Sequence, residues 1–203
     1  MKVLYFSLLV VISDQLTKFL VKGIKIPFLG INIAGMPFNS SKNVLGDFLR
    51  ITFVENQGMA MGLEMFPSAL LIIFTFIASI IILYYIFKHR NDSRILRISL
   101  AVILGGAIGN LIDRTFYGVI YNYSPLFSGK VVDFIHIGFW NFTAFGKTYT
   151  SWPILNFADI AITTGFLLIL VFHKRIFNSI NNKSAVPQVS NENETNLNDF
   201  NLS

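Results

Sequence analysis

Residues 69–87 read ALLIIFTFIASIIILYYIF, an apolar run without a charged side chain, and basic residues follow it at once in Lys88-His89-Arg90. A helix of about 20 apolar residues is long enough to cross the hydrocarbon core of a bilayer. The whole chain is 53% hydrophobic and only 13% charged, whereas soluble domains contain about 25% charged residues. The run therefore predicts a transmembrane helix and places the chain among integral membrane proteins.

Three further apolar runs predict three more spans, at residues 3–21, 95–112 and 159–173. The first could pass for a signal peptide, but it lacks a small-residue cleavage site, and Asp14 and Lys18 interrupt it, so we interpret it as a retained span. The third span in the chain carries Gly105, Gly106 and Gly109, a small-residue face suited to close helix packing. The sequence thus predicts a four-helix membrane domain over residues 1–178.

The distribution of basic residues predicts the orientation of these spans. Lys88, Arg90, Arg94 and Arg97 lie between the second and third spans, and Lys174 and Arg175 follow the fourth. Because cytoplasmic loops carry an excess of Lys and Arg, these segments and both termini are expected in the cytoplasm. The residues that argue against this orientation are Lys18, Lys22 and Lys25, at the outer end of the first span, although Asp14 can neutralise Lys18 four residues away.

The remaining segments have weaker signals. Residues 24–41 are typical of a loop, and residues 49–53 alternate apolar and polar side chains as a half-buried strand does. Residues 117–151 form a long aromatic stretch that predicts an interfacial loop. Residues 179–203 are rich in Asn, Ser and Glu, which predicts a disordered cytoplasmic tail.

Two carboxylates, Asp133 and Asp159, lie among apolar neighbours at the two ends of residues 131–159. An ionisable group at the mouth of a membrane helix is costly, so it suggests a functional site. Two such groups could share a proton and activate a water molecule. The alternative is that each aspartate caps a helix. The predicted topology adds further polar side chains to the same outer face: Asn56, Asp113, Arg114, Asp14 and Lys18.

The composition limits other kinds of chemistry. The chain contains no Cys, and His89, His136 and His173 lack metal-ligand spacing, so we expect no metal and no cofactor. The net charge of +5 is typical of positive-inside loops, and we expect no nucleic-acid partner.

Three other functions are compatible with parts of the pattern. Ser13 and Lys18 could form a Ser–Lys dyad, but side chains five residues apart on one helix diverge. A small transporter or channel could use intramembrane Asp and Lys, but these polar residues gather at one membrane face instead of tracing a path across it. A scaffold without chemistry would leave the cluster unexplained.

Five segments together resemble a known family, lipoprotein signal peptidase, also called signal peptidase II. They read DQLTK at 14–18, NQGMA at 56–60, GGAIGNLIDR at 105–114, VVDF at 131–134 and NFAD at 156–159. They occur in the family's order, and the resemblance covers about residues 3–175. The long glycine-containing string followed by the two aspartate motifs is the specific part.

The resemblance implies a fold of four transmembrane helices, all-α apart from a small extracytoplasmic β-cradle and an interfacial lid segment. It implies a bacterial inner-membrane aspartyl endopeptidase that cuts diacylglyceryl-modified prolipoproteins just before the lipidated cysteine and is inhibited by globomycin. Asp133 and Asp159 match the catalytic pair. Other motif positions are expected around the substrate pocket: Asn56, Gly58, Asn110, Arg114, Asn156, Ala158, Asp14 and Lys18. Arg114 could hold a substrate carbonyl or a carboxylate of the pocket; a surface pair with Asp113 is the alternative.

The segment between the two aspartates is rich in aromatic residues: Phe139, Trp140, Phe142, Phe145, Tyr149 and Trp152. With Gly138 and Gly146 as hinges, it is predicted to be a lid that closes over the lipid-bearing substrate. The alternative is a static anchor at the membrane surface.

Overall fold

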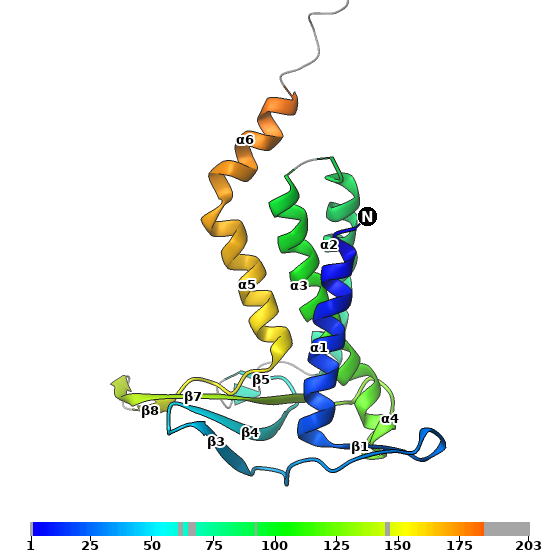
Figure 1. Ribbon diagram of the computed structural model, residues 1–203, viewed down its shortest axis with the longest axis vertical. Coiled ribbons are helices and arrows are strands. Elements are labelled where there is room, and N and C mark those ends of the chain that lie inside the picture. The colour runs from blue at the N-terminus through cyan, green and yellow to red at the C-terminus, as the bar shows by residue number, and fades with distance from the viewer. Residues whose placement is uncertain (1, 61–62, 65–67, 92, 145–146, 185–203) are drawn as a thin grey trace, which may run out of the picture.

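The computed structural model describes residues 2–60, 63–64, 68–91, 93–144 and 147–184. Its helices stand on one side of a small sheet (Figure 1). The long helices are α1 (Leu4–Lys22), α2 (Ser68–Lys88), α3 (Arg94–Ile112) and α5 (Phe157–Val171), and α6 (His173–Ser184) follows α5. The α2–α3 connection and α6 lie at the end of the helices away from the sheet (Figure 1).

The first three predicted spans are confirmed as helices long and apolar enough to cross a membrane. The fourth consists of α5 and α6, which meet at a bend of 67° and count as a span only when taken together. The helical part of the chain also extends further than predicted. Helix α6 continues to Ser184, so it includes residues 179–184, while residues 185–203 of the predicted tail lie outside the described residues.

Helix α3 packs against both α1 and α5, and its glycines allow this close approach. A Cβ atom added at Gly105 would lie 2.7 Å from the Ser7 carbonyl oxygen of α1, and one at Gly106 would lie 2.5 Å from the Ala158 carbonyl oxygen of α5. Only a residue without a side chain permits such contacts. The predicted small-residue packing face is therefore confirmed.

The sheet has four antiparallel strands in the order β3 (Ser41–Leu45), β4 (Leu49–Asn56), β7 (Val131–Ala144) and β8 (Lys147–Ser151). The strand predicted at residues 49–53 is confirmed within β4. The predicted loop at 24–41 is partly wrong, because it contains the hairpin β1 (Ile24–Ile26) and β2 (Ile31–Ile33) around the short helix η1 (Pro27–Leu29). A further small hairpin pairs β5 (Met59–Ala60) with β6 (Leu63–Glu64).

The loop predicted at residues 117–151 is partly wrong, because most of this stretch forms helical turns and strands. The chain leaves α3 through the π-helical turn η2 (Asp113–Tyr117) and the short α4 (Gly118–Ile120), then enters β7 and turns back as β8. Aromatic and β-branched residues favour strands, which explains the difference. Gly138 lies within β7, where its N–H donates to the Phe48 carbonyl at 2.8 Å and a side chain would meet Asp47. Phe145 and Gly146 lie outside the described residues.

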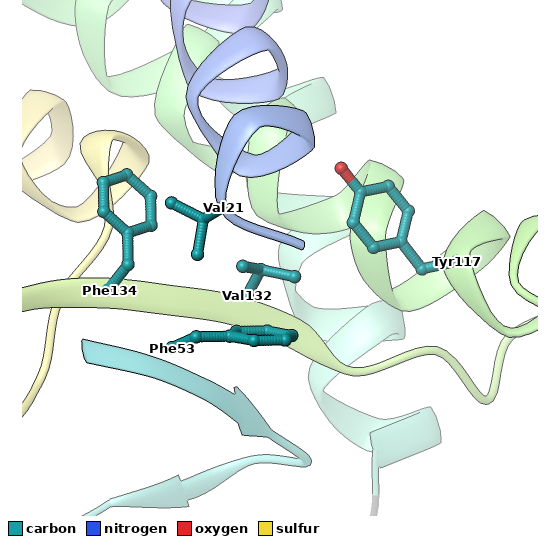
Figure 2. Close-up of a cluster of buried hydrophobic side chains, with 5 residues drawn as sticks. All are labelled: Val21, Phe53, Tyr117, Val132 and Phe134. Atoms are coloured by element: carbon teal, nitrogen blue, oxygen red, sulfur yellow. The ribbon is translucent and has the colours of Figure 1, made fainter. Parts of the chain in front are cut away.

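An apolar cluster joins the sheet to the end of α1. It consists of Val21, Phe53, Tyr117, Val132 and Phe134 (Figure 2). Two of its members, Val132 and Phe134, flank Asp133 on β7. The cluster therefore fixes the strand that carries the first candidate aspartate against the helices that carry the other candidate residues.

Candidate active site

Asp133 is almost completely buried on β7, with 4% of its surface exposed. Its Oδ1 accepts a hydrogen bond from Asn156 Nδ2 at 2.6 Å, and its Oδ2 accepts one from Asn56 Nδ2 at 3.1 Å. Burial, with a further contribution from the charge of Asp159, raises the pKa of Asp133 to about 7. A carboxyl group with such a pKa can hold or release a proton near neutral pH.

Asp159 is the third residue of α5 and forms a capping box with Asn156. The Asp159 N–H donates to Asn156 Oδ1 at 3.0 Å, and the Asn156 N–H donates to Asp159 Oδ2 at 3.1 Å. The other carboxylate oxygen, Oδ1, accepts from Asn110 Nδ2 at 2.9 Å. Helix capping is thus correct for Asp159 but wrong for Asp133, which lies within a strand.

Two asparagine side chains connect the candidate aspartates. Asn156 Nδ2 donates to Asp133 and also to Asn110 Oδ1, 3.1 Å away, while Asn110 Nδ2 donates to Asp159. Each amide group therefore has one fixed orientation. The two carboxylates belong to a single hydrogen-bond network that spans β7, α3 and the start of α5.

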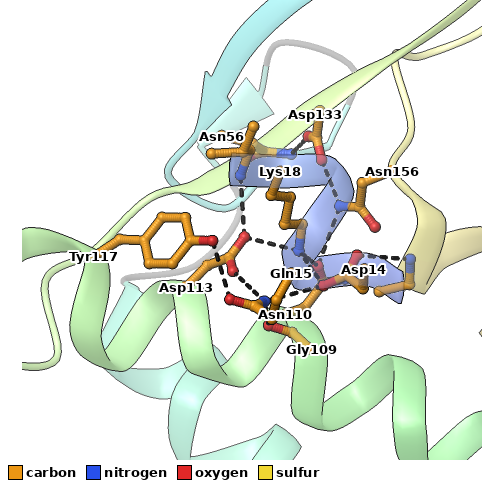
Figure 3. Close-up of polar contacts among 12 residues, drawn as sticks. Asp14, Gln15, Lys18, Asn56, Gly109, Asn110, Asp113, Tyr117, Asp133 and Asn156 are labelled. Atoms are coloured by element: carbon orange, nitrogen blue, oxygen red, sulfur yellow. Dashed lines mark hydrogen bonds and ion pairs between the residues drawn. The ribbon is translucent and has the colours of Figure 1, made fainter. Parts of the chain in front are cut away.

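Beneath this network lies a buried ionic cluster (Figure 3). Lys18 Nζ is 2.8 Å from Asp14 Oδ2, 2.8 Å from Asp113 Oδ2 and 2.9 Å from Asn110 Oδ1. The two charged pairs are completely inaccessible to solvent. Because three acceptors occupy the three N–H donors of this ammonium group, Lys18 is unsuited to act as the general base of a Ser–Lys dyad.

Two residues of the network, Gln15 and Tyr117, were not predicted, and Asp113 was predicted only as a member of the polar cluster at the outer face. Gln15 Nε2 donates to Asp113 Oδ1 at 2.9 Å, and the Tyr117 hydroxyl donates to Gln15 Oε1 at 3.0 Å. Asp113 Oδ2 also accepts the Val132 N–H at 3.2 Å, next to Asp133. The sequence did contain a signal for both missed residues. Gln15 lies inside the 14–18 motif, and Tyr117 lies four residues after Asp113, on the same face of a helix.

Arg114 does not form the surface pair with Asp113, since Asp113 is buried against Lys18. Its guanidinium group is close enough to Asp113, Asp133 and Asp159 to interact with their charges. Its Nε is buried and donates to no atom of the described residues. A buried donor without a partner carries a free-energy cost, which a hydrogen bond to a ligand would remove.

The remaining predicted residues, Gly58 and Ala158, contribute backbone groups. The Gly58 N–H donates to Asn56 Oδ1 at 2.8 Å, and the positive φ of 118° at Gly58 is one that favours glycine. The Ala158 N–H donates to Asp14 Oδ1 at 3.0 Å. The structure therefore brings all the predicted site residues to the end of the helices that meets the sheet.

Comparisons with known proteins point to a single family. The family model of signal peptidase (SPase) II matches residues 6–174. A lipoprotein signal peptidase of Pelodictyon phaeoclathratiforme is 36% identical over 176 residues, covering 86% of this chain and 92% of that protein. One of Chlorobium phaeobacteroides is 34% identical over 169 residues, covering 83% and 88%. A solved bacterial membrane enzyme superimposes with a TM-score of 0.64 at 26% identity, covering 93% of this chain and 94% of its own.

Proposed function

The chain belongs to the signal peptidase II family, and on that premise we propose that Asp133 and Asp159 are its catalytic pair. It is a multi-pass membrane protease that removes signal peptides from prolipoproteins. The observation that carries the proposal is the asparagine network that joins the buried carboxyl group of Asp133 to the half-buried one of Asp159. Such a pair suits hydrolysis, because two nearby carboxylates do not ionise together easily.

In the proposed mechanism the two aspartates have different protonation states. Asp159 acts as the base and accepts a proton from a water molecule, whose oxygen attacks the scissile carbonyl carbon. Asp133, whose pKa is raised to about 7, holds the second proton and donates it as the peptide bond breaks and the amine leaves. Asn110 and Asn156 keep both carboxylates oriented, and Arg114 Nε, which has no partner among the described residues, could donate to a substrate carbonyl.

This mechanism predicts a decline of activity at alkaline pH. The proton that Asp133 donates is present below its pKa of about 7 and is lost as the pH rises through that value. The kcat/KM for prolipoprotein cleavage should therefore fall about tenfold per pH unit above the midpoint. The measurement is the initial rate in detergent or lipid from pH 5 to 10. A flat profile up to pH 9 would contradict the assignment of the proton to Asp133.

We infer that the substrate is a prolipoprotein whose cysteine already carries diacylglycerol, cut immediately before that cysteine. The site lies where the helices meet the sheet, so a lipid-bearing residue could reach it from the membrane. Purified protein should cleave a diacylglyceryl-modified prolipoprotein, and globomycin should block the cleavage. Equal cleavage of the same prolipoprotein without its lipid would show that the lipid is not recognised.

We propose an inner-membrane topology of four spans, with both termini in the cytoplasm and the site at the outer face. The basic residues that argued against this topology are largely accounted for, because Lys18 is paired with Asp14 and Asp113 and Lys22 with Glu55. A reporter fused after Ser184 should be active only in the cytoplasm, and one inserted at Gly30 only outside. The opposite result would reverse the placement of the site.

We also infer that the β7–β8 hairpin closes over the bound substrate. It continues from Asp133 and returns toward Asp159, so movement at its far end would change access to the pair. Spin labels at Thr143 and Ser68 should change their separation when globomycin binds. An unchanged separation would favour a static anchor at the membrane surface.

A further inference from the structure

Lys22 at the end of α1 lies in a second cluster, which shares Tyr117 with the first. Its ammonium group is bonded to the Glu55 carboxylate, and the exposed fractions of the two side chains are only 7% and 16%. Three tyrosine rings surround the same ammonium group, with centroids 4.1 Å away for Tyr121, 4.7 Å for Tyr123 and 5.7 Å for Tyr117. The faces of aromatic rings attract a cation, so this enclosure stabilises Lys22 away from bulk water.

The tyrosines around Lys22 are themselves tied to different elements. The Tyr121 hydroxyl donates to the Gly23 carbonyl, 2.7 Å away at the end of α1. The Tyr123 hydroxyl accepts the Lys130 N–H at 2.8 Å, one residue before β7 begins. Glu55 lies on β4, opposite Val132 of β7. The cluster therefore joins the end of α1 to the two strands that carry Asn56 and Asp133.

Glu55 is the direct neighbour of Asn56, the last residue of β4. Successive side chains of a strand point to opposite faces, so the side chains of Glu55 and Asn56 lie on opposite faces of the end of β4. On one face Glu55 contacts Lys22, and on the other Asn56 donates to Asp133 Oδ2 at 3.1 Å. Without the first contact, the strand end would be held mainly by its pairing with Val132 and Val131 and by the longer contact between Glu55 and Lys130, at 4.0 Å.

We propose that Lys22 and Glu55 are positioning residues, whose enclosed ion pair holds the end of β4 so that Asn56 stays hydrogen-bonded to Asp133. This inference rests on the proposed catalytic role of Asp133. Neither residue contacts the reacting carboxylates through any contact that the structure gives, and each acts through Asn56.

The proposal predicts a shift in the pH profile. The groups that face Asp133 are Asp159 from α5, Arg114 from η2, Lys18 from α1, and the amides of Asn56 and Asn156. The Asn56 hydrogen bond stabilises the ionised carboxylate, so its loss raises the pKa of Asp133. Lys22→Met should lower kcat about tenfold with little change in KM. It should also shift the alkaline limb of the pH–rate profile to higher pH, by about half a pH unit.

Comparison with Glu55→Ala separates positioning from a direct effect of charge. Removing the positive charge of Lys22 would raise the pKa of Asp133 through space, whereas removing the negative charge of Glu55 would lower it. If the ion pair acts by positioning, both variants shift the alkaline limb of the pH–rate profile to higher pH. Shifts in opposite directions, or no shift in either variant, would overturn the proposal.

The decisive experiment is a double-mutant cycle with Asn56→Ala, using purified full-length protein and a lipidated prolipoprotein. Asn56→Ala alone should shift the alkaline limb of the pH–rate profile to higher pH, and adding Lys22→Met should cause no further shift. Additive shifts would overturn the proposal. Lys25→Met, at an exposed position on β1, is the matched control and should match the parent profile. If Lys22→Met does not insert stably, Glu55→Ala replaces it in the cycle.

Failure of this inference and failure of the proposed function give different results. Full activity of Asp133→Asn would refute the catalytic pair. An inactive Asp133→Asn, together with unchanged pH profiles in Lys22→Met and Glu55→Ala, would refute only the positioning role.

Discussion

Replacing either candidate aspartate by asparagine should reduce kcat/KM for prolipoprotein cleavage by at least about a thousandfold. Asparagine keeps the size of the side chain but can neither accept the proton of the attacking water nor donate one to the leaving amine. At position 133 the carboxylate accepts hydrogen bonds from Asn156 and Asn56, and at position 159 from Asn110. The loss should appear in kcat, because the side chains act in the chemical step.

The control for this prediction is the folded state of each variant. Asp159→Asn retains an oxygen that can cap α5, so insertion and thermal stability should change little. Ser13→Ala should remain fully active, because Ser13 makes no contact with Lys18 among those the structure gives. Near-parental turnover of either aspartate variant would exclude the pair, and an inactive Ser13→Ala with active aspartate variants would favour a serine nucleophile.

The second large effect is expected for Lys18→Met, and it concerns stability. Lys18 is the positive partner of two buried carboxylates, Asp14 and Asp113. Its removal leaves both without an ion-pair partner among the described residues, and breaking a buried pair from one side typically costs about 3–5 kcal/mol. For a chain of this length we expect the Tm to fall by about 10 °C. Thermal unfolding of purified protein in detergent measures the change.

A compensating variant tests the cause of this loss. If the uncompensated negative charge is responsible, adding Asp14→Asn and Asp113→Asn to Lys18→Met should recover part of the lost stability, because the amides bury no charge. Lys25→Met removes an exposed positive charge and should change the Tm by no more than about 1 °C. A Lys18→Met protein as stable as the parent would contradict the importance of the ionic cluster.

Sequence patterns predicted the helical part of the fold well, because hydropathy reports directly on burial in a membrane. The apolar run at 69–87 corresponds to α2, and the glycines at 105, 106 and 109 lie at helix contacts. The long strand β7 was missed. Its first residues, Val131 and Val132, are both buried, so the alternation that reveals a half-buried strand is absent there.

Most members of the candidate site were also predicted from the sequence, but their contacts were not. The motifs brought Asn110 and Asn156 into the site without indicating that they bridge the two aspartates. Gln15 and Tyr117 are 102 positions apart, and only the packing of α1 against η2 makes them partners. The role of Lys22 likewise depends on three tyrosines from the segment before β7, whose proximity no local pattern predicts.

The most direct test of the catalytic pair is the mass of the product that purified protein makes from a diacylglyceryl-modified prolipoprotein. We predict that the parent protein yields a mature lipoprotein beginning at the lipidated cysteine, and that Asp133→Asn and Asp159→Asn leave the precursor intact over the same period. Formation of the same product by either variant at a rate near that of the parent would contradict the assignment of catalysis to these two carboxylates.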